Sequence, residues 1–304
     1  MSISRLEQML EAVQSKPKKR LAAAFANDAH TIEAVHDAVR RGIVEATLVG
    51  DEAVIRQKCG ELGIDPARFA IVHEPADGKA AARAVALVRS GECQILMKGL
   101  VSTDKYMRAI LNKEAGLMAP GAILTHVSVI EHARYPKLLI CGDVAVLPYP
   151  ELKEKIAIAT YCIDVAHALG IARPKVAVIA ATEQVLPKIQ ATVDAAILAK
   201  MAERGQIKGA FVDGPMALDV AIDAESAATK GVGGPVAGDA DCLVFPNIDA
   251  GNVFYKTSSK LCGCEMAAMV AGAQAPCILS SRGDSVLTKL YSITLAALTA
   301  KSFL

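Results

Sequence analysis

Four side chains able to handle a proton and an anion stand together near the end of the sequence, in Ser281-Arg282-Gly283-Asp284-Ser285. A short apolar run, 276–279, precedes them and a helix-like stretch, 286–300, follows. A strand that leads into a turn and then a helix places the turn at the carboxyl edge of a parallel sheet, where helix N–H groups favour an anion. Helix capping by Ser285, with Asp284 at the helix start, is the structural alternative. The turn alone leaves both interpretations open.

Two further segments combine a strand end, a turn and a helix with residues that suit an anionic ligand. Lys98 ends a predicted strand, and Ser102 and Arg108 follow it. Capping explains Ser102, whereas Lys98 and Arg108 remain candidates for pairing with phosphate. Asn252 and Lys256 follow a glycine-containing turn that could cradle an anion, with ordinary turn formation as the alternative.

His126 and Asp143 are the remaining candidates for contact with a substrate. His126 shares the apolar register of a predicted strand, 123–130, and that register favours a buried core histidine. Asp143 lies just past the next predicted strand, 138–141, on the edge of the sheet where ligands bind.

The elements that must position these residues alternate along the chain. Short apolar runs predict strands, and most are separated by 10–20 residues with helical spacing, such as 31–41, 80–89, 155–168 and 186–203. The predicted strands are 21–26, 46–49, 69–72, 94–97, 123–130, 138–141, 176–179, 209–212, 242–245 and 276–279. This alternation predicts an α/β fold with parallel sheets, covered by helices on both faces. Ten strands are many for one sheet, so we expect two doubly wound domains, 1–136 with 273–304 and 137–272, and a ligand cleft between them.

Composition excludes several classes of function. Hydrophobic residues make up 53% of the chain and charged residues 21%, and the formal net charge of +1 predicts neither nucleic acid nor an anionic membrane as partner. No apolar run reaches the roughly 20 residues that span a bilayer, and the first 20 residues lack the apolar core of a signal peptide. We therefore expect a cytoplasmic protein.

Cysteine usage and cofactor motifs narrow the chemistry further. The eight cysteines are scattered, mostly within apolar runs, which predicts buried thiols rather than disulfides. Cys262-Gly263-Cys264 lacks a second pair at zinc spacing, so no metal site is expected. The sequence contains no Walker A motif, no Gly-x-Ser-x-Gly elbow and no His-Glu-x-x-His motif.

Taken in order, these motifs resemble those of the phosphate acetyl/butyryltransferase family. The resemblance covers roughly residues 90–300 and rests on Met97-Lys98-Gly99, Ser102-Thr103 with Arg108, Thr125-His126-Val127, Asp213-Gly214-Pro215 with Asp219, Gly234-Pro235-Val236-Ala237-Gly238, Pro246 with Ala250-Gly251-Asn252 and Tyr255-Lys256, and the turn 281–285. It implies two α/β domains of the isocitrate/isopropylmalate dehydrogenase architecture, usually dimeric. It also implies reversible acyl transfer between coenzyme A and inorganic phosphate, without a metal or redox cofactor.

The resemblance implies a role for each candidate residue. Asp284 is the candidate general base, Ser281 a hydrogen-bonding partner of the thiol or carbonyl, and Arg282 with Arg108 the phosphate clamp. The other residues expected to contact the substrate are Ser102, Lys98, Asp143, His126, Asn252 and Lys256. The sequence departs from the family at two positions. Thr288 stands where the acetyl branch carries its aspartate base, and Leu147 stands where similar chains carry an asparagine.

The residues support this chemistry independently. A thiol of pKa near 8.5 must lose its proton before it attacks a carbonyl, and a departing phosphate needs fixed positive charge. A direct ternary complex with an acetyl or butyryl substrate therefore suffices. Within the resemblance, the position of Asp284 and the segment Thr125-His126-Val127 favour butyryl or another short chain. Two other functions remain as alternatives: an NAD(P)-dependent decarboxylating dehydrogenase of the same fold, and a non-catalytic protein that binds CoA or an acyl phosphate.

Overall fold

Contacts between Cα atoms divide the chain into two compact units, in a computed structural model that describes residues 2–279 and 284–300. Unit 1 comprises Met1–Leu6 and Ile123–Met266, and unit 2 comprises Glu7–Ala122 and Ala267–Leu304. The sequence-based division assigns residues 123–136 to the first domain, whereas the contacts place them in unit 1. The reason is that the strand at 125–131 pairs with the strand at 139–142.

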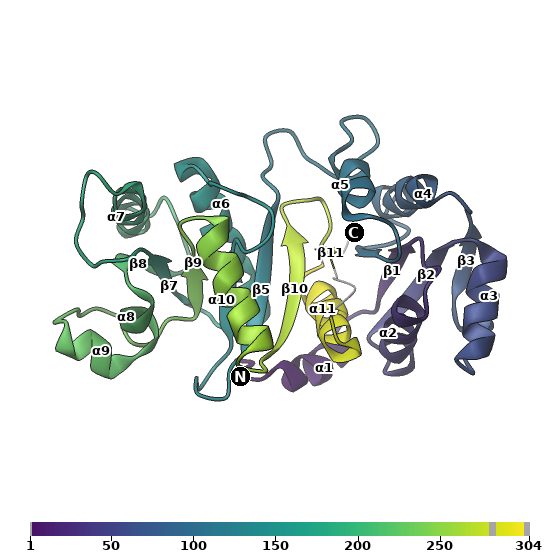
Figure 1. The fold of residues 1–304 in the computed structure, drawn as a ribbon, viewed down its shortest axis with the longest axis horizontal. Helices are drawn as coiled ribbons and strands as arrows, with labels where there is room; N and C mark the ends of the chain where they lie inside the picture. The colour runs from purple at the N-terminus through teal and green to yellow at the C-terminus, as the bar shows by residue number, and fades with distance from the viewer. Residues whose placement is uncertain (1, 280–283, 301–304) are drawn as a thin grey trace. The chain divides into compact units, whose positions relative to one another are not determined.

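Unit 2 is built from repeated strand–helix pairs (Figure 1). Its elements are α1 (Leu6–Gln14), β1 (Lys19–Ala24), α2 (Ala29–Arg40), β2 (Val44–Gly50), α3 (Glu52–Glu61), a 3-10 turn η1 (Pro66–Arg68), β3 (Ala70–His73), α4 (Asp77–Arg89), β4 (Ile95–Lys98), α5 (Thr103–Leu111), β10 (Glu265–Ala271, whose first two residues belong to unit 1), β11 (Cys277–Ile278) and α11 (Val286–Thr299).

The strands of unit 2 follow the order β3-β2-β1-β4-β11-β10. All neighbours are parallel except β10, which pairs with β11 in the antiparallel sense. Helix α4 packs with α5, and α11 packs with α2, on opposite sides of the strands (Figure 1). The chain leaves β1 in one direction toward β2 and returns on the other side as β4. The carboxyl ends of β1 and β4 therefore form a topological switch point, the usual ligand edge of such sheets.

Unit 1 contains a second alternating series. Its elements are β5 (Thr125–Glu131), β6 (Leu139–Gly142), α6 (Leu152–Ala168), β7 (Lys175–Ile179), α7 (Gln190–Glu203), β8 (Phe211–Met216), α8 (Leu218–Ile222), α9 (Ala224–Thr229), β9 (Cys242–Val244) and α10 (Ile248–Lys260).

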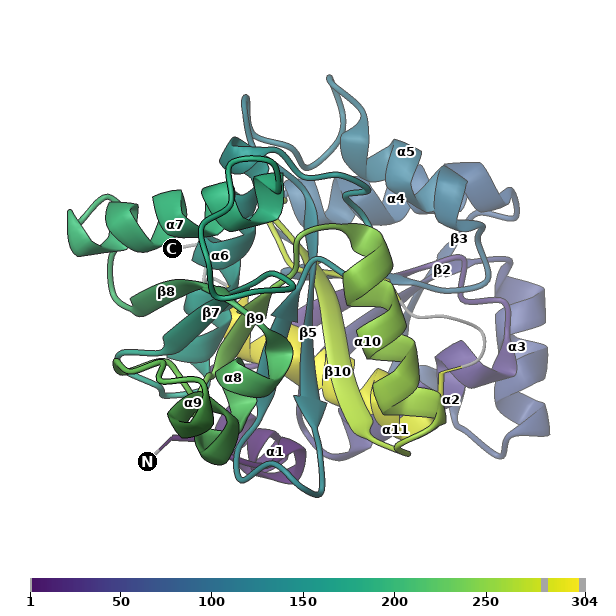
Figure 2. The same cartoon turned by 60° about the vertical axis from the view of Figure 1, so that its left-hand side comes forward.

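The strands of unit 1 follow the order β5-β6-β9-β7-β8. β5 and β6 are antiparallel, and the other neighbours are parallel. Helices α6 and α7 lie on one side of these strands, with α8 and α9 on the other (Figures 1 and 2). The carboxyl ends of β6, β9 and β7 consequently face the same edge, from which α6 and α10 begin.

The predicted α/β class is confirmed, whereas the purely parallel sheets are wrong. Ten strands are predicted and the described residues form eleven, because β10 is absent from the prediction. Its sequence, Glu-Met-Ala-Ala-Met-Val-Ala, consists mainly of residues that favour helices, and burial between neighbouring strands outweighs that preference. The antiparallel contacts of β10 with β11 and of β5 with β6 make the sheets mixed.

Local sequence explains where the helices begin. The helices expected around 31–41, 80–89, 155–168, 186–203 and 286–300 are confirmed as α2, α4, α6, α7 and α11. Side-chain oxygens cap many of the helices by accepting a hydrogen bond from a first-turn N–H, which satisfies a donor that has no partner within the helix. These caps include Asp28, Asp51, Ser102, Asp223, Asn247 and Ser285.

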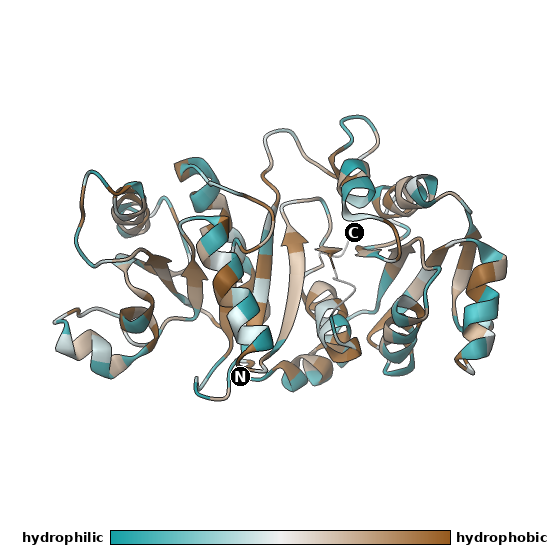
Figure 3. Ribbon diagram, in the orientation of Figure 1, coloured by the Kyte–Doolittle hydropathy of each residue, from teal (hydrophilic) through white to brown (hydrophobic). Residues whose placement is uncertain are grey.

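Most residues of the strands are apolar, with exceptions such as Lys19 and Arg20 at the start of β1, and the helices carry apolar and polar faces (Figure 3). This pattern buries the strands beneath amphipathic helices. Six of the eight cysteines are buried, Cys262 is exposed, and all eight thiols are free. Burial raises the pKa of the Cys141 and Cys242 thiols well above the usual range. No helix in the described part of the chain is both long and apolar enough to cross a membrane.

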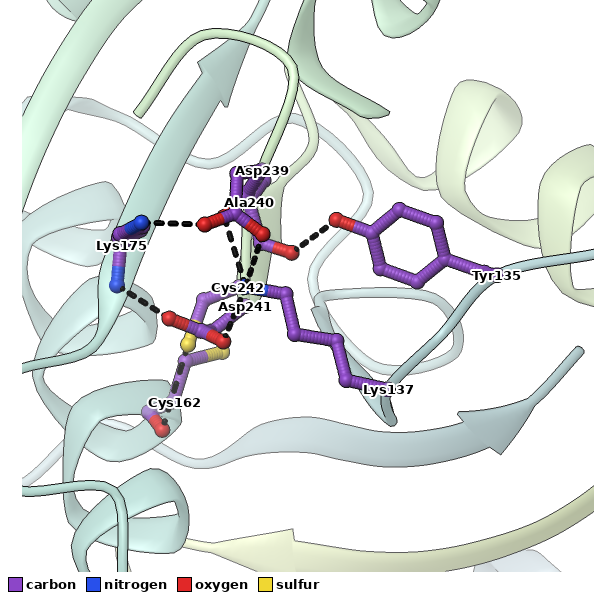
Figure 4. A network of polar contacts seen from close by, with 8 residues as sticks. All are labelled: Tyr135, Lys137, Cys162, Lys175, Asp239, Ala240, Asp241 and Cys242. Carbon is purple, nitrogen blue, oxygen red and sulfur yellow. Dashed lines mark hydrogen bonds and ion pairs between the residues drawn. The ribbon is translucent and has the colours of Figure 1, made fainter. Parts of the chain in front are cut away.

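A polar network joins the amino ends of the unit 1 strands, opposite the edge from which α6 and α10 begin (Figure 4). Lys137 Nζ lies 2.7 Å from a carboxylate oxygen of both Asp239 and Asp241, just ahead of β6 and β9. Lys175, the first residue of β7, pairs with Asp239 and donates its backbone N–H to Asp241. Tyr135 donates its hydroxyl to the carbonyl of Ala240 at 2.6 Å. The network therefore holds three strands in register.

Replacing Lys137 by methionine removes the ammonium that both carboxylates share. Asp241 is 5% exposed, so the loss leaves its charge without that partner. We expect the free energy of unfolding to fall by roughly 1–3 kcal/mol, below the 3–5 kcal/mol typical of a fully buried pair. Urea denaturation measures the change, and Lys200→Met, which breaks the exposed pair with Glu203, is the matched control. Equal effects of the two substitutions would contradict the role of the network.

The effect of Lys137→Met should also depend on pH. Burial opposes ionisation of Asp239, but hydrogen bonds from Lys137 and Lys175 outweigh it and lower the pKa of this carboxyl. A lowered pKa contributes stability above the unfolded value, about 3.9, and that contribution disappears as pH falls through the folded value. The difference between wild type and variant should stay constant from about pH 8 to 5 and shrink below about pH 4. A difference that grows on acidification would refute this assignment.

Candidate active site

The carboxylate of Asp143 organises the ligand edge of unit 1. Asp143 directly follows β6, is 2% exposed, and accepts five hydrogen bonds. Oδ2 accepts from Thr125 Oγ1 at 2.7 Å, from the His126 N–H at 2.9 Å and from the Leu147 N–H at 3.3 Å. Oδ1 accepts from the N–H groups of Ala145 and Val146, at 2.6 and 2.8 Å. Asp143 therefore holds the start of β5 and the loop after β6 in one arrangement.

The departure from the family at Leu147 leaves this arrangement intact. Leu147 contributes through its backbone N–H, which any residue except proline supplies. The loop is thus preserved, and only a contact made by the side chain of an asparagine is lost.

His126, Tyr255 and Lys256 come together beside this loop. His126 is 4% exposed, as its apolar register predicts, and its ring meets that of Tyr255 edge to face, with centroids 6.1 Å apart. Lys256 Nζ lies 5.5 Å from the centroid of the Tyr255 ring, within range of a cation–π interaction. Tyr255 is the aromatic side chain that joins His126 and Lys256. The sequence did not indicate Tyr255 as a single candidate residue.

Asn252 and Gly251 fix α10 against the same loop. Asn252 Nδ2 donates to the carbonyl of Val144 at 3.0 Å. A Cβ atom at Gly251 would lie 2.2 Å from the carbonyl oxygen of Asp143, so only glycine permits this approach. Four predicted residues, His126, Asp143, Asn252 and Lys256, consequently belong to one cluster, with Asn252 in a positioning role.

In unit 2, Lys98 stands at the switch point between β1 and β4. It is 6% exposed, and its Nζ donates to the carbonyl of Gly99 at 3.2 Å. The Gly99 N–H binds the Ala24 carbonyl, and a Cβ at Gly99 would lie 2.5 Å from the carbonyl oxygen of Phe25. Phe25 has a φ of 58°, an unfavourable value for a bulky residue that the surrounding structure must impose. The ends of β1 and β4 are therefore locked together next to a buried ammonium group.

Tyr106 is a positioning residue that the sequence analysis did not identify. It is fully buried on α5, and its hydroxyl lies 3.3 Å from the carbonyl oxygen of Leu96 and 3.1 Å from that of Ile278. It thus joins strands β4 and β11 close to their carboxyl ends. Lys98 is the last residue of β4, and the turn 281–285 follows β11 in the sequence. Burial raises the pKa of the hydroxyl well above its usual value, so it remains a donor. Its apolar register on an amphipathic helix was the available signal, and it marks burial rather than function.

Ser102 and Arg108 occupy the first and last turns of α5. Ser102 is the N-cap, accepting from the Lys105 N–H at 3.3 Å, as its capping interpretation predicts. Arg108 pairs with Asp104 at 3.1 Å, and the two side chains are 79% and 65% exposed. An exposed pair four residues apart contributes only about 0.3–0.5 kcal/mol, so a phosphate could displace Asp104 at small cost.

Of the turn 281–285, the structure describes Asp284 and Ser285. Ser281 and Arg282 lie outside the described residues. Asp284 is half-buried, and Ser285 caps α11 by accepting from the Thr288 N–H at 3.0 Å, while its hydroxyl also donates to Thr288 Oγ1 at 3.0 Å. Thr288 is thus a buried member of the helix cap. Asp284 is the only carboxylate between residues 276 and 300.

Two motifs carried by the resemblance serve packing instead. A Cβ at Gly214 would lie 2.7 Å from the Val178 carbonyl oxygen, and one at Gly238 would lie 2.6 Å from the Cα of Ala224. Gly238 also donates its N–H to the carbonyl of Val220 at 2.7 Å. Gly214 therefore lets β8 approach β7, and Gly238 lets its own loop approach α8 and α9.

The two units therefore present related sets of groups at strand ends. Unit 1 offers a lysine, a histidine and an aromatic ring held by a buried carboxylate. Unit 2 offers a buried ammonium, an exposed guanidinium, a helix N-terminus and one carboxylate. Among the described residues, no group of three His, Cys, Asp or Glu side chains is placed to hold a metal ion. Fixed cations and helix N–H groups suit a phosphate, and a carboxylate suits proton transfer.

Solved structures place this fold among the phosphotransacylases. A branched-chain phosphotransacylase from Enterococcus faecalis superposes with a TM-score of 0.80 at 29% identity, covering 93% of this chain and 99% of that one. A 4-hydroxythreonine-4-phosphate dehydrogenase from Burkholderia phymatum shares the fold alone, with a TM-score of 0.56 at 13% identity and coverage of 94% and 99%.

Sequence relatives identify the family. The family model described as phosphate acetyl/butaryl transferase matches residues 67–297. Phosphate butyryltransferase of Clostridium acetobutylicum is 48% identical over 98% of this chain and 99% of its own length. Phosphate acetyltransferase of Thermotoga maritima is 42% identical over 97% and 99%, respectively. The chain belongs to the phosphate acetyl/butyryltransferase family, as its ordered motifs predict.

Asp143→Asn tests the organising role of the carboxylate. An amide group offers one oxygen in place of two, and its NH₂ group would face donors, so we expect the free energy of unfolding to fall by about 3 kcal/mol. Chemical denaturation gives the value. Asp249→Asn, an exposed change in the first turn of α10, should cost less than about 1 kcal/mol. An Asp143 variant as stable as this control would show that the hydrogen bonds contribute little.

Proposed function

We propose that this protein is an acyltransferase that moves a short-chain acyl group reversibly between coenzyme A and inorganic phosphate. The observation that carries the proposal is family membership over nearly the whole chain, with 48% identity to a phosphate butyryltransferase. The dehydrogenase resembles this chain in fold alone, at 13% identity, and this likeness gives no support to the nicotinamide-dependent alternative.

The reaction requires a thiolate, an electrophilic carbonyl and a departing phosphate. In the direction that forms acyl-CoA, a base takes the thiol proton and the sulfur forms a bond to the carbonyl carbon. The bond between that carbon and the phosphate oxygen then breaks, and its electron pair leaves with the phosphate. Positioning both substrates together contributes roughly 7–11 kcal/mol in well-oriented reactions, so a ternary complex without a covalent enzyme intermediate suffices.

Asp284 is the proposed base. It stands half-buried directly before the cap of α11, and Thr288, at the position of the acetyl-branch aspartate, is occupied as a neutral member of that cap. The described residues offer no acceptor to the N–H groups of Val286 and Leu287 at the start of the helix. These donors suit the phosphate or the oxyanion that develops on the carbonyl. Ser281 and Arg282, in the same turn, are proposed to bind the thiol or carbonyl and the phosphate.

The other site residues are proposed to hold the substrates. Arg108 is the second phosphate clamp, because its weak pairing with Asp104 leaves the guanidinium open to exchange. Lys98 supplies buried positive charge at the end of β4, the strand that precedes the helix of Arg108, α5. In unit 1, His126 and Lys256 face a common aromatic ring and are proposed to contact the acyl or CoA portion.

Several finer statements are part of the proposal. Residues of both units act on one acyl group in the cleft expected from the sequence, the protein works as a homodimer in the cytoplasm, and the chemistry needs no metal or redox cofactor. A short chain, with butyryl preferred to acetyl, is the proposed substrate. The support for this preference is that the 48% and 44% identical relatives are named phosphate butyryltransferases, against 42% for a phosphate acetyltransferase.

The experiment follows CoA-dependent consumption of butyryl phosphate and of acetyl phosphate by the purified protein. We expect turnover of both, with a higher kcat/KM for butyryl phosphate. Failure with both substrates, despite CoA binding, would leave the non-catalytic alternative as the function.

Asp284→Asn should lower kcat/KM by about 10²–10⁴-fold, the usual contribution of a general base. The KM for butyryl phosphate should change little, because the proton is transferred only in the transition state. Asp77→Asn is the matched control, since Asp77 also lies in the first turn of a unit 2 helix and should leave the rate unchanged. Full activity in the Asp284 variant would show that Asp284 is not the general base, without contradicting the proposed overall reaction.

Arg108→Gln tests the phosphate clamp. We expect it to raise the KM for inorganic phosphate about tenfold, since a charge-assisted hydrogen bond contributes roughly 1.5–3 kcal/mol. Thermal stability should hardly change, because the lost pair with Asp104 is exposed. An unchanged KM for phosphate in the folded variant would exclude this contact.

A further inference from the structure

A cavity of about 500 Å³ opens within unit 1 and lies outside the cluster around His126. Its lining comes from the loop after β6, from the starts of α6 and α7, and from the residues just before α10. The volume falls within the 300–1,000 Å³ of typical small-molecule sites, and the carboxyl edge of a sheet is where such sites occur.

The polar part of the cavity is a buried ion pair. Lys155 of α6 donates to Asp194 Oδ2 of α7 at 2.6 Å, and the two residues are 4% and 3% exposed. Gln190 Nε2 donates to Asp194 Oδ1 at 2.8 Å. All three residues line the cavity. A buried ion pair adds little net stability compared with apolar residues of equal size, so stability does not explain it.

This pair retains hydrogen-bonding capacity on both of its partners. Asp194 is the only acceptor that the described residues give Lys155 Nζ, which carries three N–H donors. Asp194 receives two hydrogen bonds, whereas a carboxylate has about four acceptor positions. The cavity thus offers a donor and an acceptor side by side, at a depth where leaving them unused is costly.

The rest of the lining is largely apolar, and its charge is unfavourable to anions. The apolar lining consists of Tyr149, Pro150, Leu152, Ala191, Ile197 and Pro246, with Tyr149 75% exposed and Ile197 37% exposed. The charged lining residues are two carboxylates and one ammonium, a net charge of −1. A phosphate group would therefore be disfavoured, whereas an uncharged apolar chain would not.

We propose that this cavity binds an uncharged chain that carries amide groups, with the amide carbonyl accepting from Lys155 and the amide N–H donating to Asp194. An amide has one acceptor and one donor side by side, which match the ammonium and the carboxylate of the ion pair. The apolar groups next to the amide in such a chain match the apolar residues that line the cavity. The pantetheine arm of coenzyme A has this chemistry. The identification of that source rests on the proposed function.

The cavity is also linked to the Asp143 loop. Tyr149 and Pro150 end the loop that Asp143 holds at its other end. The Ile248 N–H at the start of α10 binds the carbonyl of Pro148 at 3.0 Å, next to the cavity. A chain seated there would contact the loop that positions Thr125 and the His126 backbone.

The test replaces the pair without leaving a lone buried charge. Lys155→Met with Asp194→Leu is an apolar pair of similar volume, which should fold with near-normal stability. Calorimetry with free pantetheine measures binding without turnover. We expect the Kd for pantetheine and the KM for CoA to rise at least tenfold, with the KM for butyryl phosphate unchanged. The matched control, Lys200→Met with Glu203→Leu, removes an exposed ion pair on α7, the helix of Asp194, and should alter none of these values.

A second probe, N-acetylvalinamide, distinguishes the source of the amide. Pantetheine binding that is weakened by the double substitution and competes with CoA assigns the cavity to the coenzyme. Binding of N-acetylvalinamide that is weakened in the same way but does not compete with CoA supports the amide site and overturns its assignment to the coenzyme. Unchanged binding of both probes in the folded variant overturns the proposal, whatever the result of the turnover assay.

Discussion

The ligand edge of unit 1 depends on one buried carboxylate. Asp143 accepts hydrogen bonds from the first residues of β5 and from the loop that follows β6, so two antiparallel strands and the loop share one anchor. The backbone approach at Gly251 brings α10 against the same residue. Because a buried carboxylate is tolerated only when it is fully hydrogen-bonded, each of these elements constrains the others. The side chains of His126 and Lys256 take their positions from this arrangement rather than from their own hydrogen bonds to Asp143.

Unit 2 achieves comparable order with neutral groups. Gly99 lets the end of β4 approach the end of β1, and the positive φ of Phe25 is the strained backbone that this approach requires. Tyr106 joins β4 to β11 through its hydroxyl. Strand ends that are joined in this way cannot move independently, which suits residues that must act on the same anion. The exposed Arg108, by contrast, is held by one weak ion pair and can adjust to a substrate.

Sequence patterns identified most elements of the fold because apolar periodicity and capping residues are local. Ser102 and Ser285 begin their helices where the pattern places them. β10 was missed because its alanines and methionines favour helix locally, and only its burial among other strands makes it extended. For the site, residue types that follow strand ends indicated Asp143 and Asn252, but not that Asp143 accepts five hydrogen bonds, four of them from backbone N–H groups. Tyr106 and the pair of Lys155 with Asp194 were beyond prediction, since their partners are distant in sequence.

The burial of the cysteines has a chemical consequence for a protein of this family. Thioesters and acyl phosphates react with thiolates, so any ionised cysteine in the protein would compete with the acceptor and become acylated itself. Burial keeps Cys141, Cys242 and Cys277 protonated, raising the pKa of Cys277 to about 12. Cys262 alone among the eight thiols is exposed. The apolar interior that stabilises the strands therefore also protects the buried thiols from acylation.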